Sequence, residues 1–386
     1  MSWTTVRIGD HCEITSSKRI FLSDYVDAGI PFWRSKEVIE QENGQSISDP
    51  LFITHDKYEE IKNRFGVPKP GDMLLTSVGT IGIPFIVKST SPFYFKDGNL
   101  TWFRNFAVTL SSRYLYYWIK SNTGHQTLNN LTIGSSQKAL TIENLKNAKI
   151  PLPDLPTQRR IASILSAYDD LIENNRRQIK LLEEAAQRLY REWFVELRFP
   201  GHEGVKVMDG VPEGWMKVCL KDICETKTGK KDANFGCDDG AYPFFTCAQA
   251  PIKAPSYSFD CSAVILAGNG DFNVKLYRGK FEAYQRTYVL SPANTEYLFL
   301  LYNAVSRNMN VLTKGASGST IKFLTKGMID SIELLIPSNQ LLTTYNQNSE
   351  ALQKSIEALH RKVALAVEAR DRLLPRLMNH EMEVML

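Results

Sequence analysis

WTTVRIGDHCE, at residues 3–13, recurs as WMKVCLKDICE at residues 215–225, an offset of 212 positions. The same offset relates IPFW at 30–33 to YPFF at 242–245. Two later pairs match at offsets of 184 and 186, so the second copy lacks a loop's worth of residues: Leu140–Thr141 with Leu324–Thr325, and Ile150–Pro151 with Ile336–Pro337. A long internal repeat predicts one structural unit built twice.

A long helix is predicted after each copy. Residues 157–195 contain neither Gly nor Pro, and apolar residues recur at steps of four and three, the heptad pattern of a coiled-coil seam. The pattern returns 184 positions later, where Leu359 is the counterpart of Asn175, the polar position of the first seam. The positions expected to pair the helices are Ile161, Leu165, Ile172, Ile179, Leu182, Leu189, Leu352, Ile356, Leu359, Val363, Leu373 and Leu377.

A narrow apolar seam needs a partner, and the repeat supplies one within the chain. We therefore expect the two helices to pair as an antiparallel coiled coil, which makes the molecule an internal pseudo-twofold repeat. A plain coiled-coil dimeriser would explain the helices equally well, but it leaves the two globular blocks without a role.

Each globular block is predicted to be mixed α and β structure. Apolar, β-branched runs such as Met73–Val78 and Ala263–Ala267 lie between Gly and Pro, and Ser112–Lys120 and Glu296–Arg307 have helical patterns. Regular strand–helix alternation is absent, which argues against a doubly wound parallel sheet. The expected fold class is α+β (mixed). The expected boundaries are 1–150 for a first globular domain, 151–198 for the first helix, 199–214 for a linker, 215–336 for a second globular domain and 337–386 for the second helix.

Composition narrows the class of protein. The 386 residues carry a net charge of +4, which permits nucleic-acid binding without establishing it. No apolar run approaches the roughly 18–20 residues of a membrane span, and the first residues lack the apolar core of a signal peptide. A cytoplasmic protein is expected. The 6 Cys residues form no Cys-x-x-Cys pair, so no metal site is predicted.

The segments that join the blocks to the helices resemble those of a known family. IPLPDLPTQRRI at 150–161 looks like the entry to the first conserved helix of type I restriction–modification DNA-specificity subunits. FPGHE at 199–203 and DGVPEGW at 209–215 resemble that family's passage into its second target-recognition domain. The second helix entry, IPSNQ at 336–340, has one Pro where the first has three, which weakens the expectation of strict symmetry.

The resemblance implies a sequence-specific DNA-recognition subunit that reads a bipartite, asymmetric site in double-stranded DNA, one half with each domain. It also implies that two methyltransferase subunits dock on the helices and that motor–nuclease subunits join through them. S-adenosylmethionine, ATP and Mg would be bound by those partners and no cofactor by this chain, with adenine the expected methylated base. A type IIB-like specificity subunit and a scaffold that reads no DNA remain as alternatives.

The sequence lacks the motifs of a methyltransferase and of an ATP-driven motor, and its match to a metal nuclease is weak. An adenine methyltransferase holds its flipped base with an Asx/Ser-Pro-Pro-aromatic turn, and the chain contains no Pro-Pro. Gly268-Asn269-Gly270 resembles a nucleotide loop, but no helix pattern follows it, so a turn between strands is expected. Asp49 with Glu60-Ile61-Lys62 fits the spacing of a metal nuclease, as many charged chains would. A Walker loop is absent too, and no catalytic residue is predicted.

Loops that combine Lys or Arg with hydroxyl and amide groups in both copies are the candidate DNA contacts. Three pairs of segments recur: Lys18–Arg19 with Lys227–Lys231, Trp33–Lys36 with Phe245–Ala248, and Ile133–Lys138 with Gly315–Lys322. Arg34 is the preferred base reader, because a guanidinium can bind guanine O6 and N7 together. Trp33 and Phe245 fit the core better, and the Gly/Ser/Thr loops fit phosphate clamps and plain surface turns equally. The candidates are Lys18, Arg19, Arg34, Lys36, Thr80, Asn99, Arg104, Ser135, Ser136, Lys138, Lys227, Lys230, Lys231, Asn269, Asn273, Lys275, Arg286, Lys314, Ser317, Ser319 and Lys322.

Overall fold

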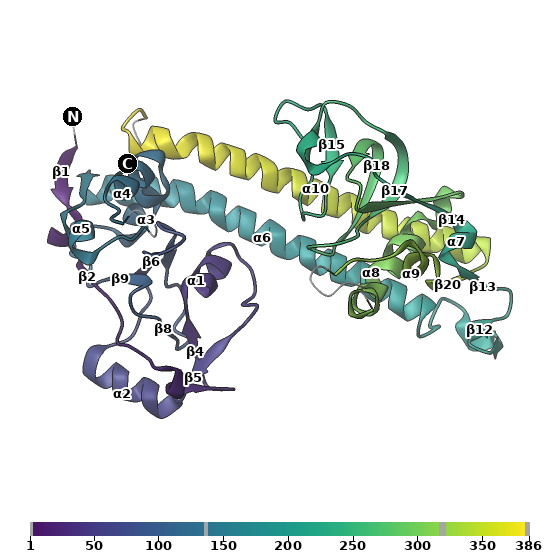
Figure 1. The fold of residues 1–386 in the computed structure, drawn as a ribbon, viewed down its shortest axis with the longest axis horizontal. Coiled ribbons are helices and arrows are strands. Elements are labelled where there is room, and N and C mark those ends of the chain that lie inside the picture. Colours follow the sequence, from purple (N-terminus) through teal and green to yellow (C-terminus); the bar gives the residue numbers. More distant parts are fainter. Residues whose placement is uncertain (1–2, 135–137, 316–321, 383–386) are drawn as a thin grey trace. The chain divides into compact units, whose positions relative to one another are not determined.

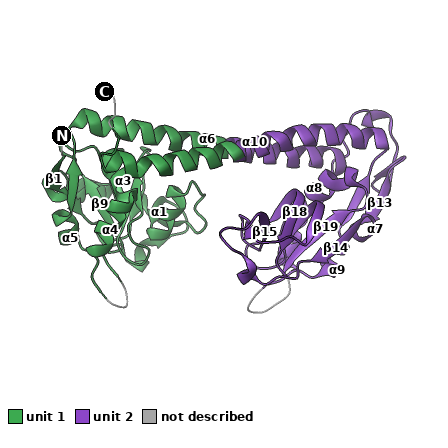
Figure 2. Cartoon of the chain, turned by 90° about the horizontal axis from the view of Figure 1, so that it is seen from above, with its two compact units in different colours: residues 1–176, 361–386 green, residues 177–360 purple. Residues whose placement is uncertain are grey.

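The computed structural model describes residues 3–134, 138–315 and 322–382 (Figure 1). The chain divides into two compact units, the first of residues 1–176 with 361–386 and the second of residues 177–360 (Figure 2). Each unit therefore combines one globular block with a part of each long helix. No helix within the described ranges is long and apolar enough to cross a membrane.

The first unit is built on two four-stranded sheets. One has the order β2 (Glu13–Thr15), β9 (Leu100–Arg104), β6 (Met73–Thr76), β7 (Pro84–Ile86), and the other β3 (Tyr25–Val26), β5 (Leu51–Ile53), β4 (Ile30–Trp33), β8 (Tyr94–Phe95). A separate pair joins β1 (Thr4–Arg7) to β10 (Lys149–Leu152). The helices of the block are α1 (Ser35–Glu42), α2 (His55–Phe65), α3 (Ser112–Lys120), α4 (Asn122–Asn130) and α5 (Ile142–Asn147).

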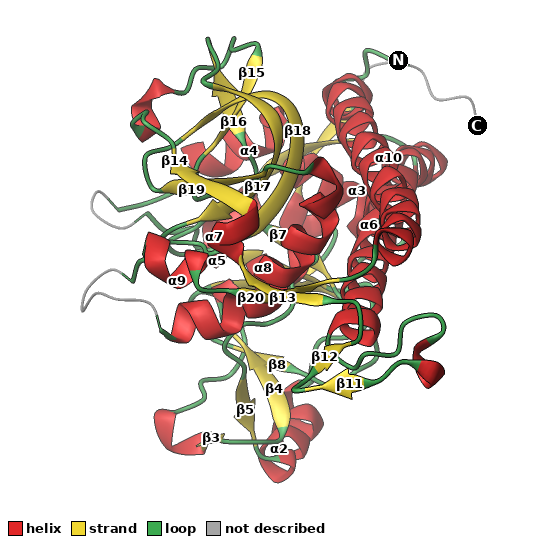
Figure 3. Ribbon diagram, turned by 90° about the vertical axis from the view of Figure 1, so that its right-hand side faces the viewer, coloured by secondary structure: helices red, strands yellow, loops and turns green. Residues whose placement is uncertain are grey.

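The second unit has one curved six-stranded sheet (Figure 3). Its order is β14 (Cys224–Thr228), β19 (Thr287–Pro292), β17 (Phe259–Ala267), β18 (Val274–Ala283), β15 (Tyr242–Phe245), β16 (Ile252–Ala254). Two further pairs are β11 (Val207–Met208) with β12 (Val211–Pro212), and β13 (Met216–Cys219) with β20 (Glu333–Ile336). The helices of this block are α7 (Leu220–Ile223), α8 (Leu298–Lys314) and α9 (Lys326–Asp330).

The two blocks share one fold, which confirms the repeat. Val6 pairs with Ile150 in the first unit, and its counterpart Val218 pairs with Leu334 in the second. The strand register therefore makes Leu334 the counterpart of Ile150, at an offset of 184. The sequence match of Ile150–Pro151 with Ile336–Pro337 was wrong by two residues. A shift of two keeps every side chain on the same face of a strand, so the apolar pattern fits both alignments.

The units differ in one strand and in one insertion. The continuous β18 of the second unit pairs with both β17 and β15. In the first unit its place is taken by two short strands, β7 and β8, and the sheet is split in two. Trp33 and Met73 are 40 positions apart, whereas their counterparts Phe245 and Val264 are 19 apart. Helices α1 and α2 occupy the additional length in the first unit.

The long helices are α6 (Leu155–Phe194) and α10 (Asn339–Met378). The carboxylate of Asp154 accepts a hydrogen bond from the backbone N–H of Thr157 at 3.0 Å, which caps the start of α6. The fully buried Gln158 fixes this start to the block, because its side chain bonds the N–H of Ser111 and the carbonyls of Thr109 and Pro153. The helix begins at Leu155, four residues after the expected boundary at 151, and includes Pro156 in its first turn.

Within each unit α6 and α10 run antiparallel, as the sequence predicts. In the first unit Arg370 donates to Asp169 at 2.7 Å, and Tyr117 of α3 donates to the other oxygen of that carboxylate at 2.6 Å. In the second unit the ring of Tyr345 lies 5.9 Å from that of Trp193 and 4.8 Å from that of Phe194. In both units the residue numbers rise along α6 as they fall along α10.

The heptad positions that are predicted to pair the helices are all buried or partly buried. Ile161, Leu165, Ile172, Ile179, Ile356, Leu359 and Leu377 are buried, and Leu182, Leu189, Leu352, Val363 and Leu373 are partly buried. The blocks pack on the same helices. Trp118 of α3 and Phe103 of β9 share one core with Leu165, and Asn303 of α8 donates to the Tyr345 hydroxyl at 2.9 Å.

Candidate nucleic-acid interface

In the first unit, several predicted segments meet at Asn99, in the loop between β8 and β9. The backbone carbonyl of Asn99 accepts from the N–H of Ser77 at 2.8 Å and from the hydroxyl of Ser35 at 3.5 Å. This joins the β6–β7 turn, which carries the exposed Thr80, to the turn that carries Arg34 and the exposed Lys36.

Lys18 and Arg19 approach the same loop from the other side. The N–H of Lys18 donates to the Tyr94 hydroxyl at 2.6 Å, and the Arg19 guanidinium bonds Asp97 at 2.9 Å. The Lys18 ammonium lies 4.6 Å from the ring centre of Phe65, at the end of α2. Both basic side chains are exposed, which suits them to phosphate contacts.

The guanidinium of Arg34 is already bound within the protein. It donates to the buried carboxylate of Glu37 and, at 3.1 Å, to Asp49. The hydrogen bonds to Glu37 and Asp49 raise the pKa of Arg34, with Glu37 as the main cause. A contact with guanine would therefore have to replace the bond to Asp49 or use the remaining donors. Arg34 remains a candidate DNA contact, and it also has a structural role in binding Glu37 and Asp49.

Arg104 lies on the Lys18 side of the candidate set, because its guanidinium donates to the carbonyl of Phe65, whose ring also contacts the Lys18 ammonium. It ends β9, five residues beyond Asn99, which corresponds to roughly 16 Å at about 3.3 Å per residue. Its guanidinium bonds Glu13 at 2.6 Å and stacks on Trp102 at 4.4 Å. That hydrogen bond lowers the pKa of Glu13. Arg104 thus connects β9 with β2 and points to a structural role.

In the second unit the candidates gather where the β17–β18 turn meets the loop after β15. The Asn273 amide donates to the carbonyl of Cys247 at 2.9 Å, and the Lys275 ammonium donates to the carbonyl of Ala248 at 2.9 Å. The Cys247 thiol lies 2.9 Å from the side-chain oxygen of Asn269. Cys247 was not among the predicted contacts, although the repeated segment 245–248 had marked its loop.

The lysines after β14 join this edge through backbone contacts. Lys231 forms a parallel bridge with Tyr284, and the N–H of Gln285 donates to its carbonyl at 2.9 Å. The Lys231 ammonium lies 4.3 Å from the Phe235 ring centre, and Lys230 is exposed. Lys227 lies farther back on β14, in an ion pair with Glu225.

Matching backbone hydrogen bonds hold the loops in both units. The N–H of Ser77 bonds the Asn99 carbonyl at 2.8 Å, and the N–H of Gly268 bonds the Arg286 carbonyl at 2.9 Å. The carbonyls of Ser77 and Gly268 in turn accept from Leu140 and Leu324, each at 2.8 Å. Lys138 and Lys322 precede these leucines by two residues and are exposed, as is Lys314 at the end of α8. Ser135, Ser136, Ser317 and Ser319 lie outside the described residues.

The glycine turns and the acidic residues can be compared with the catalytic alternatives. Gly268-Asn269-Gly270 joins β17 to β18 and is followed by a strand, so it lacks the helix N-terminus that binds a nucleotide phosphate. Asp49 bonds Arg34, while Glu60 pairs with Lys57 and Arg64. Among the described residues, no group of three or more His, Cys, Asp or Glu is placed to hold a metal ion.

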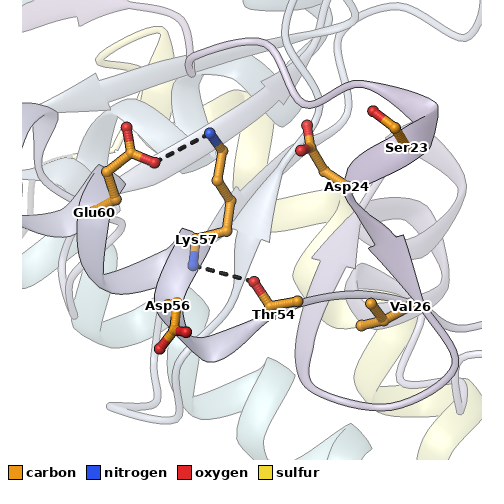
Figure 4. A pocket seen from close by; sticks show the side chains of 7 residues that line it. All are labelled: Ser23, Asp24, Val26, Thr54, Asp56, Lys57 and Glu60. Carbon is orange, nitrogen blue, oxygen red and sulfur yellow. Dashed lines mark hydrogen bonds and ion pairs between the residues drawn. The ribbon is translucent and has the colours of Figure 1, made fainter.

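A cavity of about 340 Å³ lies beside α2 in the first unit (Figure 4). Three carboxylates and one ammonium line it, together with small residues: Ser23, Asp24, Val26, Thr54, Asp56, Lys57 and Glu60. Lys57 is bound by Glu60 at 3.2 Å. This acidic lining is unsuited to DNA phosphates, so the loops around Asn99 stay the candidate DNA contacts of this unit.

Two copies of one block, each packed on paired antiparallel helices and each presenting a basic loop edge, are the architecture of a two-part DNA-recognition protein. The model of the Type I restriction modification DNA specificity domain matches residues 1–184 and again residues 212–368. The chain belongs to this family. The two matched segments contain the two blocks and most of both long helices.

Relatives carry the same description. The type I restriction enzyme EcoDI specificity subunit of Escherichia coli is 42% identical over 150 residues, 38% of this chain and 33% of that protein, so this match spans a third of the relative's length. The MjaIX specificity subunit of Methanocaldococcus jannaschii is 25% identical over 99% of this chain and 94% of its own. The crystal structure of a type I S subunit from M. genitalium aligns with a TM-score of 0.63 at 15% identity, over 100% and 97% of the chains, and shows the shared fold.

Proposed function

We propose that the chain is the DNA-recognition subunit of a type I restriction–modification complex and that it reads a bipartite, asymmetric site. Residues 1–150 would read one half-site and residues 215–336 the other. The observation that carries the proposal is the double family match together with equivalent loop edges in the two units. Because equivalent positions hold different side chains, such as Asn99 and Arg286, the two halves would have different sequences.

The chain itself would have no catalytic activity. We propose that two methyltransferase subunits dock on the long helices and that motor–nuclease subunits join through them. S-adenosylmethionine, ATP and Mg would be held by these partners. The glycine turn between β17 and β18 supports this division, since it offers no helix N-terminus to a nucleotide.

A domain exchange tests the proposal. The full chain, assembled with its methyltransferase subunits, would first be used to map methylated adenines in host DNA. Replacing residues 1–150 by the corresponding domain of another family member should then change one half of the site and leave the other unchanged. Replacing residues 215–336 is the matched control and should change the other half. A change in both halves after a single exchange would show that the domains are not independent readers.

A methylation assay tests the division of labour. The purified chain with DNA and labelled methyl donor should transfer no methyl group, and addition of methyltransferase subunits should produce methylated adenine. Turnover by the chain alone would overturn the non-catalytic assignment. A scaffold that reads no DNA would leave the methylated sequence unchanged after either domain exchange, which separates that alternative from the proposed function. The partner subunits that co-purify with the chain would distinguish a type IIB-like system from a type I system.

A further inference from the structure

We propose that Lys275 is a specificity-determining residue of the second unit and that it donates hydrogen bonds to a guanine in the major groove. The inference rests on the proposed function. It narrows the candidates of this unit to one side chain and one type of base. The inference rests on the hydrogen bonds of the Lys275 ammonium, whose acceptors are all uncharged. These bonds lie where the β17–β18 turn meets the loop after β15.

The surroundings of Lys275 hold its ammonium group in place. The side chain is partly buried, and the ammonium donates to the carbonyl of Ala248 and to the side-chain oxygen of Asn273. Asn273 is fixed in turn by its bond to the carbonyl of Cys247. The direction of the ammonium is thus set before DNA arrives, which reduces the entropy lost on binding.

Within the described residues no carboxylate bonds the Lys275 ammonium directly, and Asp271 acts on it only through electrostatic attraction. Each hydrogen-bond acceptor that the ammonium contacts is uncharged, and it takes part in no ion pair in the part of the chain that the structure describes. Burial lowers the pKa of Lys275, which reflects the cost of desolvating the cation, although Asp271 and Cys247 oppose the shift. Two of the three ammonium N–H groups are bound to Ala248 and Asn273, and guanine O6 and N7, which are acceptors with high electron density, would share the third.

A base contact fits this geometry better than a phosphate contact. Phosphates are usually met by exposed, flexible lysines, of which Lys230 in the same unit is an example. Lys275 instead bonds the amide of Asn273, and Asn269 contacts Cys247 in the adjoining loop; Asn is a side-chain type that reads adenine edges. The strand register makes Phe85 its counterpart in the first unit. The feature therefore belongs to one half-site only.

The experiment compares Lys275→Met with wild type in the complex of the full chain with its methyltransferase subunits. Binding would be measured against the mapped site and against every single base-pair change in it. Wild type should discriminate at one guanine position of the second half-site by about 5- to 150-fold, the range of one good base contact. Lys275→Met should lose that discrimination and keep the preferences at all other positions. Lys280→Met, which removes an exposed lysine of the same strand, is the matched control and should leave the base preferences unchanged.

The outcomes separate the inference from the function on which it rests. Equal weakening at all sequences with a shallower salt dependence would assign Lys275 to a phosphate and overturn the inference. Unchanged discrimination by Lys275→Met would overturn it too. If wild type itself discriminates at no position, the proposed function fails instead.

Thiol alkylation gives a second measurement that needs no variant. Cys247 adjoins Asn269, and the loop that carries it contacts Lys275, so bound DNA should cover this thiol. Maleimide labelling of the wild-type complex, read by peptide mass spectrometry, should slow at Cys247 by at least about 10-fold when site DNA is present. Cys219, a thiol of the β13–β20 pair in the same unit, is the internal reference. Equal labelling of Cys247 with and without site DNA would show that this edge does not face the DNA and would overturn the inference.

Discussion

Replacement of Asn175 by Leu should stabilise the protein. Asn175 is 4% exposed within α6, and its amide nitrogen has no hydrogen-bond partner among the described residues of the chain. A buried donor without a partner costs about 1–3 kcal/mol. Leu has similar volume, and the corresponding position of the other helix is already Leu359. Asn175→Leu should therefore raise the free energy of unfolding by about 2 kcal/mol.

The assay is thermal unfolding followed by the helical circular dichroism signal. Asn175 belongs to a unit of about 200 residues, for which 1 kcal/mol moves the melting temperature by about 2–4 °C. Asn175→Leu should raise it by about 4–8 °C. The reciprocal variant Leu359→Asn buries an amide in place of an alkyl group and should lower it, at a cost of about 3 kcal/mol. A lower melting temperature for Asn175→Leu would refute the reasoning, because it would mean that the amide has a partner worth more than the apolar contact.

Two further substitutions test the helix surface and the predicted base reader. Leu182→Asp places a charge at a partly buried heptad position and should lower the free energy of unfolding in urea by about 2 kcal/mol. The control Leu181→Asp, at the adjacent exposed position, should change it by less than about 0.5 kcal/mol. Equal effects of the two variants would show that the heptad positions are wrongly assigned. Arg34→Ala leaves the carboxylate of Glu37 buried without its cation and should cost about 3 kcal/mol, while Arg34→Lys should recover part of this stability. If Arg34→Ala instead keeps full stability and loses discrimination at one base pair, the guanidinium serves DNA alone.

The architecture could be predicted from the sequence because it leaves signals that are long and repeated. The heptad spacing extends over some forty residues in each helix, and the repeated WxxV segment fixes the start of each block. The sequence specifies the strand register less precisely than it specifies the helices and the repeat. Ile150 was matched to Ile336, although the ladder equates it with Leu334, because a shift of two positions preserves the buried face. The split of one strand into β7 and β8 has no comparable signal.

The clustering of the candidate DNA loops could be predicted from the sequence, whereas the contacts of their side chains could not. Repeated segments marked the loops at 33–36 and 245–248, and the structure brings each of them to the turn that follows β6 or β17. The state of each side chain depends on contacts that are distant in the sequence. Arg34 meets Asp49 across 15 positions, and Lys275 meets Ala248 across 27. Those contacts decide which cations are free to bind DNA.

Under the proposed function, the way the loops are held would let one fold serve two different half-sites. Part of the hydrogen bonding that fixes each edge runs between backbone atoms, from Ser77 to Asn99 in the first unit and from Gly268 to Arg286 in the second. A backbone hydrogen bond is indifferent to the side chain that its residue carries. Substitution at these positions can therefore change the groups offered to the bases while the loop keeps its place. Phe85 and Lys275 occupy equivalent positions of the two units, which shows that this position can hold an apolar or a cationic side chain. In the proposed function, the DNA sequence that is read could therefore change without a change in the backbone ladder or in the helix pair.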